Sequence, residues 1–351
     1  MKSFSWLLLF FFSLEMAFAQ ELSPPAKSFD AGIRVGEKTP AFRLKNQSGK
    51  EFDFNAIKGP KGAAILFFRS ADWCPYCKTA LVQLQGALSK YKAQGLGVAA
   101  ISYDSVEVLE TFGKRANITY PMLSDSDSAV IRAFGILNTQ VPQNSPQYGI
   151  PYPGTFIVDP GGKIVAKYFE EDFRERFTPD TIITKQVGSG GGHQVEVKTE
   201  HLTLSTSISQ EKARPGNRIT LVAEVKLPPK MHIYAPGVEG YRPAVLAIEA
   251  SPDLTAHAPR FPESKIMLLP AIKERVPVYE GKVRIMRDFT ISQNTKPPTV
   301  EVRGRFEYQA CDDKICYLPK TVPLAFTIDI ESFDRERVPE ALRRRAPSSQ
   351  D

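Results

Sequence analysis

The chain changes its pattern of apolar and polar positions near its middle. In the first half, residues 63–68 form a continuous apolar run, which predicts a strand buried on both faces. Residues 96–103 form a second apolar strand. Between them, apolar positions at three- and four-residue spacing from Leu81 to Tyr91 predict a helix that ends near Gly95. Strand, helix and strand in succession indicate a sheet with a parallel core.

Shorter elements complete the first half. They are a hairpin around Ser48-Gly49 within 42–54, helices over 106–116 and 128–135, a long polar loop over 137–148, and a hairpin of strands 155–159 and 164–166.

In the second half the period changes to two. After a glycine-rich stretch at 188–192, apolar residues alternate with polar ones in the segments 219–227, 300–310 and 322–330. Short alternating strands with Pro- and Gly-rich turns and little helix predict an antiparallel β-sandwich.

Composition agrees with two ordinary globular domains, since the chain has 351 residues and 42% hydrophobic content. The N-terminus carries Lys2, an apolar run over 6–12 and an Ala17-Phe18-Ala19 cleavage pattern, which predicts a secretory signal peptide. We therefore expect a soluble periplasmic or secreted protein, with an uncleaved N-terminal anchor as the alternative. Export places the cysteines in a compartment where disulfides persist.

The formal net charge is +6 and its densest cluster is Arg343-Arg344-Arg345. Aromatic residues do not interleave with this cluster, so we expect no nucleic-acid partner. A basic, solvated C-terminal tail over 331–351 is the expectation, in contact at most with an anionic membrane surface.

Cys74 and Cys77 lie at the start of the first predicted helix, directly after Trp73. A helix N-terminus favours the thiolate form, so Cys74 is the expected nucleophile, and Pro75 suits the first helical position. A redox dithiol is favoured over a structural disulfide. A metal site is disfavoured because the next cysteine is Cys311 and the four histidines lie far apart.

A second pair, Cys311 and Cys316, joins two strands that are predicted to form a hairpin. Such pairing gives a Cα separation of roughly 4.5 to 5.5 Å, within the range of a disulfide. The alternation places Cys311 on the other face of the sheet from Phe306, away from the core. A bridge in so small a loop adds roughly 2 kcal/mol or less, which favours a reactive couple over a structural bridge.

Residues 30–185 resemble the thioredoxin fold, in the redoxin branch that includes peroxiredoxins and thiol reductases. The resemblance rests on the segments 68–77, 120–125 and 153–159. It implies that Pro153 is a cis-proline facing the cysteines, with an ordinary loop proline as the alternative. It also implies that Tyr152 and Trp73 contact a bound substrate.

One departure separates thiol exchange from peroxide reduction. Peroxiredoxins carry a Thr or Ser three residues before the reactive cysteine and a Pro seven before it. Here those positions are Ala71 and Phe67. Exchange is therefore favoured, although Cys77 could still resolve a sulfenic acid on Cys74.

Residues 195–330 resemble the N-terminal domain of the thiol:disulfide interchange protein DsbD, an immunoglobulin-like sandwich. The matching residues are 231–234, 279–282 and 308–319. The resemblance implies that Tyr279 belongs to a loop that caps Cys311 and Cys316, although the cysteine spacing is one residue shorter than in that family.

The expectation is an α/β thioredoxin-like fold followed by an all-β immunoglobulin-like sandwich, forming an exported thiol:disulfide oxidoreductase with two cysteine couples. No cofactor is expected. The expected partners are exported thiol and disulfide proteins, with a membrane electron donor left open. Alternatives are a thiol-dependent peroxidase and a binding module with two inert bridges. The expected boundaries are 1–19 for the signal peptide, 30–185 for the redoxin domain, 186–194 for the linker, 195–330 for the sandwich and 331–351 for the tail.

Overall fold

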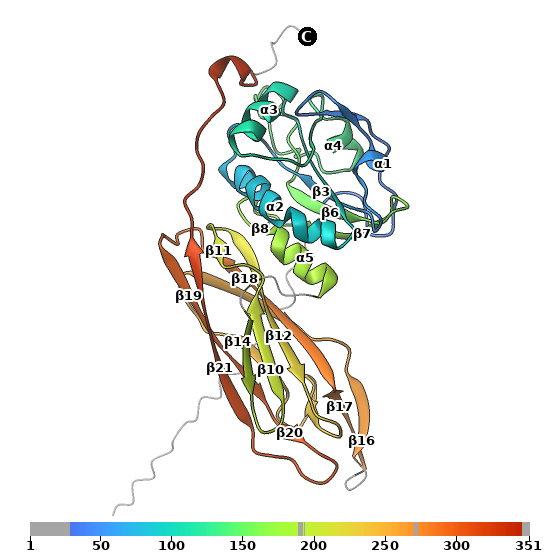
Figure 1. The fold of residues 1–351 in the computed structure, drawn as a ribbon, viewed down its shortest axis with the longest axis vertical. Coiled ribbons are helices and arrows are strands. Elements are labelled where there is room, and N and C mark those ends of the chain that lie inside the picture. Colours follow the sequence, from blue (N-terminus) through green and yellow to red (C-terminus); the bar gives the residue numbers. More distant parts are fainter. Residues whose placement is uncertain (1–28, 189–191, 193, 270–272, 346–351) are drawn as a thin grey trace, which may run out of the picture.

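The structure, a computed structural model, describes residues 29–188, 192, 194–269 and 273–345. The predicted signal peptide lies outside these residues. An α/β domain is followed by a longer β-sandwich, and the two pack end to end (Figure 1).

The first domain is built on a seven-stranded sheet in the order β2-β1-β5-β4-β3-β6-β7. Strands β3, β4 and β5 are parallel, whereas β1, β6 and β7 run antiparallel to their neighbours, so the predicted parallel core and both hairpins are confirmed. The strands are β1 (Leu44–Asn46), β2 (Glu51–Phe52), β3 (Ala63–Phe67), β4 (Gly97–Ser102), β5 (Met122–Ser124), β6 (Gly154–Val158) and β7 (Ile164–Phe169).

Helices cover both faces of this sheet. Ala64 and Leu66 of β3 share a core with helices α2, α3 and α5, whereas Ile65 and Phe67 point to the face that α1 and α4 cover. Both faces of β3 are therefore buried, as its continuous apolar run predicts. The helices are α1 (Phe54–Ile57), α2 (Pro75–Ala93), α3 (Val106–Arg115), α4 (Ala129–Ala133) and α5 (Pro179–Val187).

The second domain is a β-sandwich, as predicted. The sheets β15-β18-β12-β10-β9 and β11-β21-β19-β14 enclose one apolar core, and a smaller sheet, β16-β17-β13-β20, lies at the end remote from the α/β domain (Figure 1). The strands are β9 (Gln194–Lys198), β10 (Thr203–Ile208), β11 (Lys212–Ala213), β12 (Asn217–Lys226), β13 (His232–Tyr234), β14 (Val245–Ile248), β15 (Leu254–Arg260), β16 (Lys265–Leu269), β17 (Glu274–Glu280), β18 (Lys282–Ile291), β19 (Thr299–Tyr308), β20 (Ala310–Cys311) and β21 (Lys320–Ile330).

Backbone pairing ties the two domains together. Strand β8 (Arg176–Phe177) of the first domain pairs in parallel with β12 of the sandwich. Helix α5 follows, and it occupies the first two residues of the predicted linker before Gly188 closes it in a left-handed conformation with a φ of 76°. Lys185 of α5 forms a buried ion pair with Asp288 of β18, at 2.6 Å.

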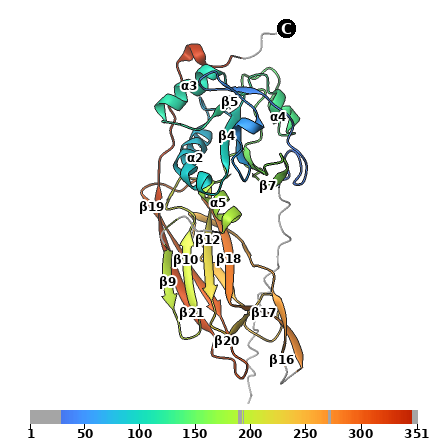
Figure 2. The same ribbon diagram turned by 45° about the vertical axis from the view of Figure 1, so that its right-hand side comes forward.

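Residues 332–344 do not form the solvated tail that was predicted over 331–351, and residues 346–351 lie outside the described residues. We call residues 332–344 the C-terminal strap, because they run back along the α/β domain and end in a short 3-10 helix at Glu340–Leu342 (Figures 1 and 2). Val338 is buried in the core beneath α2 and α3. The expectation was wrong because charged and apolar residues of the strap, among them Arg337 and Val338, find partners on the first domain that no local pattern reveals.

Candidate active site at the start of helix α2

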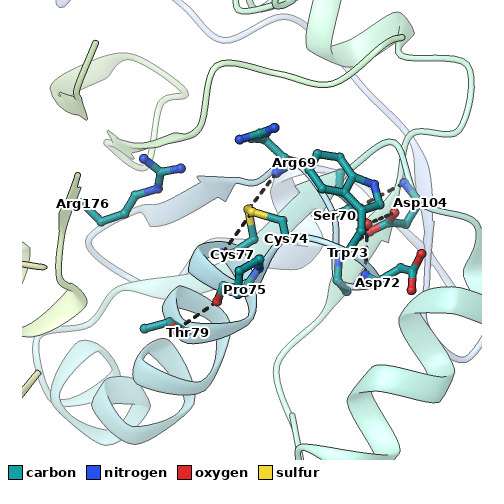
Figure 3. Close-up of a disulfide and its surroundings, with 12 residues drawn as sticks. Arg69, Ser70, Asp72, Trp73, Cys74, Pro75, Cys77, Thr79, Asp104 and Arg176 are labelled. Carbon is teal, nitrogen blue, oxygen red and sulfur yellow. Dashed lines mark hydrogen bonds between the residues drawn. A yellow bond between two sulfur atoms is a disulfide. The ribbon is translucent and has the colours of Figure 1, made fainter. Parts of the chain in front are cut away.

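Cys74 and Cys77 form a disulfide at the start of α2, with their Cα atoms 5.2 Å apart (Figure 3). Cys74 is the N-cap of the helix, and its sulfur accepts a hydrogen bond from the backbone N–H of Cys77 at 3.3 Å. Pro75 occupies the first helical turn, as predicted. This is the position in which free amides and the helix dipole stabilise a thiolate.

A buried carboxylate fixes the loop that leads into the cysteines. Asp104, after β4, accepts hydrogen bonds from Ser70 Oγ at 2.8 Å, from Ala71 N–H at 2.7 Å and from Ser102 Oγ at 3.0 Å (Figure 3). Burial raises the pKa of Asp104 to about 6, and these hydrogen bonds oppose that rise. The sequence reading missed Asp104, since its partners lie on neighbouring segments.

The disulfide is covered. Cys74 and Cys77 are each 1% exposed. Tyr76 stacks edge-on against Phe333 of the strap, with ring centroids 4.7 Å apart, and its hydroxyl bonds Gln293 of the sandwich at 3.2 Å. Cys74, the expected nucleophile, is therefore not accessible in this arrangement, because the second domain and the strap close over the motif.

The strap is fastened beside the cysteines. Arg337 forms a bidentate ion pair with Asp72, and the backbone N–H of Val338 donates to the same carboxylate at 3.0 Å. Lys78, whose side chain is 1% exposed, donates to the carbonyl of Glu336. Asp72 and Lys78 flank the CxxC motif, so the strap contacts both of its ends.

The predicted substrate-binding residues of the first domain serve structural roles here. The peptide bond before Pro153 is trans, because the cis bond among the described residues is Pro297–Pro298, so the cis-proline prediction is wrong. Tyr152 uses its backbone N–H to bond the carbonyl of Ile136 at 2.7 Å and cannot offer it to a substrate. Trp73 remains beside the cysteines, with its indole N–H bound to the hydroxyl of Tyr103 at 2.9 Å.

The positions that hold peroxide in peroxiredoxins are apolar and occupied. Ala71 is 1% exposed and its N–H is taken by Asp104, while Phe67 is fully buried in the core. The structure thus supplies no hydroxyl at the position that the resemblance singled out.

The second pair is also a disulfide, with Cα atoms 4.0 Å apart, closer than the hairpin estimate. Cys311 does lie on the other face of the sheet from Phe306. It is nevertheless buried, at 1% exposure, in a small apolar cluster that it forms with Tyr234, Val276 and Val278. The prediction that this face is open was wrong for Cys311 and correct for Cys316, which is exposed. Cys316 is therefore the more accessible residue of the pair.

An aromatic residue does lie at this pair, but it is Tyr234. Its hydroxyl is 3.3 Å from the sulfur of Cys316 and 3.5 Å from that of Cys311. Tyr279, the predicted cap, points into the main core and bonds the carbonyl of Pro262 at 2.9 Å. The correction follows from the alternation of β17, in which Val278 takes the side of the cysteines and Tyr279 the opposite side.

The turn between the second cysteines is organised by Asp312. Its carboxylate accepts from the backbone N–H groups of Lys314 and Ile315 and from the hydroxyl of Tyr317 at 2.8 Å. These bonds hold the pKa of Asp312 below its usual value. The pair lies in an open pocket of about 390 Å³ that His232, Tyr241 and Leu269 help to line.

Helix α2, which begins at the first disulfide, lies beyond one end of the sandwich, and β20, which ends at Cys311, lies at the other end (Figures 1 and 2). Tyr76 of the first motif contacts Gln293, in the segment between β18 and β19, whereas Cys311 follows the far end of the ten-residue strand β19. At about 3.3 Å per residue, the strand alone spans roughly 30 Å. Direct exchange across the linker is therefore not possible in this arrangement.

The structure describes neither a metal centre nor a membrane span. Within residues 29–345, apart from the undescribed gaps, no three His, Cys, Asp or Glu side chains gather as metal ligands. In the same residues no helix combines the length and apolar character needed to cross a bilayer.

Comparison with known proteins divides the chain in the same way. Residues 35–167 match the model of the AhpC/TSA family, and residues 201–327 match that of the N-terminal part of the thiol:disulfide interchange protein DsbD. A peroxiredoxin-type protein of Coxiella burnetii, bcp, is 32% identical over 138 residues, which cover 38% of this chain and 87% of that protein.

Thiol-disulfide oxidoreductase ResA of Bacillus thuringiensis subsp. konkukian is 23% identical over 145 residues, covering 41% of this chain and 75% of ResA. Among solved structures, peroxidoxin BcpB from Mycobacterium tuberculosis aligns with a TM-score of 0.36 at 20% identity, covering 40% of this chain and 88% of that one. The chain therefore belongs to the AhpC/TSA family, as a thiol-based oxidoreductase in which a redoxin domain is followed by a DsbD N-terminal domain.

Proposed function

We propose that the protein is an exported thiol:disulfide oxidoreductase whose first redox couple is Cys74–Cys77. The observation that carries this proposal is the position of Cys74 as N-cap of α2, with Cys77 one turn behind it and already joined to it. Dithiol exchange requires a stabilised thiolate and a resolving thiol within reach, and this placement of the two cysteines supports both.

The proposed reaction has two steps. The Cys74 thiolate attacks one sulfur of a substrate disulfide, so that a mixed disulfide forms and the other substrate sulfur leaves as a thiolate. The Cys77 thiolate then attacks the sulfur of Cys74 and releases the second substrate thiolate. The substrate gains two electrons and the CxxC pair returns to the disulfide. The reverse sequence oxidises a dithiol.

A thiol-dependent peroxidase is the second candidate, supported by the peroxiredoxin-type relative. The buried, apolar Ala71 argues against it, because no hydroxyl stands at the predicted peroxide-binding position.

Stopped-flow fluorescence separates these two activities. Trp73 lies beside the cysteines and the sequence holds only one other tryptophan, Trp6 in the predicted signal peptide. Reduced protein mixed with a peptide disulfide should react at least tenfold faster than with hydrogen peroxide, and Cys74→Ser should abolish the signal. A faster reaction with peroxide would make the protein a peroxidase first.

Cys311 and Cys316 are proposed as a second couple that exchanges with an outside partner. The exposure of Cys316 and the surrounding pocket support this role. The partners proposed are exported thiol or disulfide proteins, and a membrane electron donor would supply reducing equivalents. The signal-peptide pattern of residues 1–19 supports export.

The third candidate is a binding module in which both bridges are inert. Reduction potentials distinguish it, since structural disulfides in exported proteins have values below roughly −300 mV. We expect both pairs to lie above that limit, and two values below it would favour the binding module.

A further inference from the structure

Two arginines lie near the first disulfide and form no ion pair with any residue that the structure describes (Figure 3). Arg69 follows β3, and its guanidinium lies 4.0 Å from the ring centre of Phe173 and 4.7 Å from that of Trp73. Its backbone N–H contacts the sulfur of Cys77 at 3.4 Å. Its buried Nε has no hydrogen-bond acceptor among the described residues.

Arg176 approaches the same disulfide from β8 (Figure 3). It is 7% exposed, its Nη1 donates to the carbonyl of Glu175, and its buried Nη2 has no acceptor in the described part of the chain. Burial, together with the charge of Arg69, lowers the pKa of Arg176 to about 9. Two positive groups, each with a buried N–H that lacks an acceptor among the described residues, are thus held close together in a poorly solvated place.

The neighbouring carboxylates are already committed to other arginines. These pairs are Asp72 with Arg337, Glu170 and Glu175 with Arg218, and Asp172 with Arg174. Asp104 is bound by hydroxyl and amide donors. A buried arginine usually has a carboxylate or phosphate as its partner. The N–H groups of Arg69 and Arg176 without an acceptor therefore indicate that an anion binds here in another state of the protein.

We propose that this anion is the sulfur of Cys74 after reduction, and that Arg69 and Arg176 form a cationic cradle that stabilises the thiolate. A disulfide sulfur is neutral and a weak acceptor, whereas a thiolate carries a full charge. This inference rests on the proposed redox use of Cys74 and Cys77.

The electron and proton balance is that of ordinary dithiol exchange. A partner dithiol protein breaks the Cys74–Cys77 bond and is itself oxidised to a disulfide. Of the partner's two sulfhydryl protons, one protonates Cys77, which becomes a thiol, and the other is released to solvent. Cys74 remains as the thiolate, next to the two guanidinium groups.

The sandwich positions one half of this cradle. The N–H of Arg176 bonds the carbonyl of Gly216, at 2.8 Å, and the pairing of β8 with β12 continues from there. A Cβ atom at Gly216 would lie 2.0 Å from the carbonyl oxygen of Arg174, so this close backbone approach requires glycine. The second domain therefore sets the electrostatics of the first redox couple through a backbone contact.

The test uses the reduced full-length chain. The variants Arg69→Met and Arg176→Met remove charge at similar length, and Arg69→Lys and Arg176→Lys retain it. Arg43→Met is the control, because Arg43 is an exposed arginine of the first domain that is paired with Glu51. Peptide-resolved mass spectrometry of alkylation against pH gives the pKa of Cys74, and equilibration with dithiol buffers gives the potential of the pair.

Each Met variant should raise the pKa of Cys74 by about one unit and make the dithiol about tenfold less stable against the disulfide. That factor lowers the potential by about 30 mV. The Lys variants should recover most of the change and Arg43→Met should cause none. Gly216→Ala, which displaces β8 without altering a charge, should shift both values in the same direction as Arg176→Met.

The proposal is overturned if folded Met variants, checked by thermal melting, keep the wild-type thiol pKa and potential, or if the Lys variants behave like the Met variants. Should a Met variant fail to fold, the proposal still predicts that Gly216→Ala shifts the Cys74 pKa and the potential and that the Lys variants stay close to the wild type. Wild-type values in Gly216→Ala would then overturn it. Alkylation needs no protein substrate, so a shifted Cys74 pKa would stand even if the chain exchanged no disulfides, and the two proposals can fail separately.

Discussion

The guanidinium of Arg337 binds the carboxylate of Asp72 through two hydrogen bonds, Nε to Oδ1 at 2.7 Å and Nη2 to Oδ2 at 2.5 Å. Asp72 precedes Cys74 by two residues, and Arg337 lies 265 positions away in the sequence. The last segment of the described chain is thereby anchored at the entrance to the CxxC motif. Access to Cys74 requires this strap, or the domain interface beside it, to open.

Releasing the strap should expose the first disulfide. In Arg337→Ala the carboxylate of Asp72 loses both charged hydrogen bonds, and Phe333 loses the anchor that holds it against Tyr76. We expect dithiothreitol to reduce Cys74–Cys77 several times faster than in the wild type, as followed by peptide-resolved mass spectrometry.

The strap supplies its own control. Arg335 is exposed and has no ion pair among the described residues, so Arg335→Ala should leave the rate unchanged. The Cys311–Cys316 bridge in the same molecule should also be reduced at the wild-type rate. Equal rates for Arg337→Ala and Arg335→Ala would show that the strap does not limit access.

The buried carboxylate of Asp104 should make stability depend on pH. Its folded pKa, about 6, lies above the ordinary value of 3.8, so the native state binds the proton more tightly than the unfolded state does. The free energy of unfolding should therefore fall as the pH rises from about 4 to about 6, by about 3 kcal/mol at 1.36 kcal/mol per pKa unit. Asp104→Asn, which cannot ionise, should lack this decrease.

Urea unfolding at several pH values between 4 and 7.5 measures the effect. Glu110→Gln serves as the control, since Glu110 is an exposed residue paired with Lys114 on the surface of α3. Parallel stability curves for the wild type and Asp104→Asn would contradict this account of the loop before the cysteines.

The hydroxyl of Tyr234 should promote the reactivity of the second pair. It lies within hydrogen-bonding distance of both sulfurs and can donate to the thiolate of reduced Cys316. Tyr234→Phe should raise the pKa of that thiol and slow its alkylation at pH 7 several-fold. Tyr241→Phe is the control, because Tyr241 packs on Tyr234 but its hydroxyl bonds Glu274. Unchanged alkylation in Tyr234→Phe would remove this role.

Local sequence signals predicted much of the fold. The apolar run of β3, Pro75 at the first turn of α2 and Gly95 after its end are features of single segments, and each occurs where the sequence placed it. The alternation of β19 and β21 was equally sufficient for the hairpin that carries Cys311. Such signals depend on local propensity and burial, which can be inferred from residues close together in the sequence.

The missed features depend on contacts between distant segments. Asp104 and Arg176 are defined by partners on other strands, and the strap by a salt bridge across 265 positions. One element was within reach: Thr178 as N-cap, Pro179 at the first turn and Gly188 at the end are helix signals that mark α5. Tyr279 was placed wrongly because a motif match was used without its strand alternation.

The central claim is that Cys74 attacks protein disulfides and Cys77 resolves the product. The most direct test expresses the full-length Cys77→Ser variant in cells that also produce the exported proteins. Non-reducing gels and mass spectrometry of Cys74 peptides then detect mixed disulfides between Cys74 and those proteins. The account predicts adducts that disappear with dithiothreitol and in Cys74→Ser/Cys77→Ser, and that increase when Arg337→Ala releases the strap. An absence of Cys74 adducts from both the closed and the released chain would contradict it.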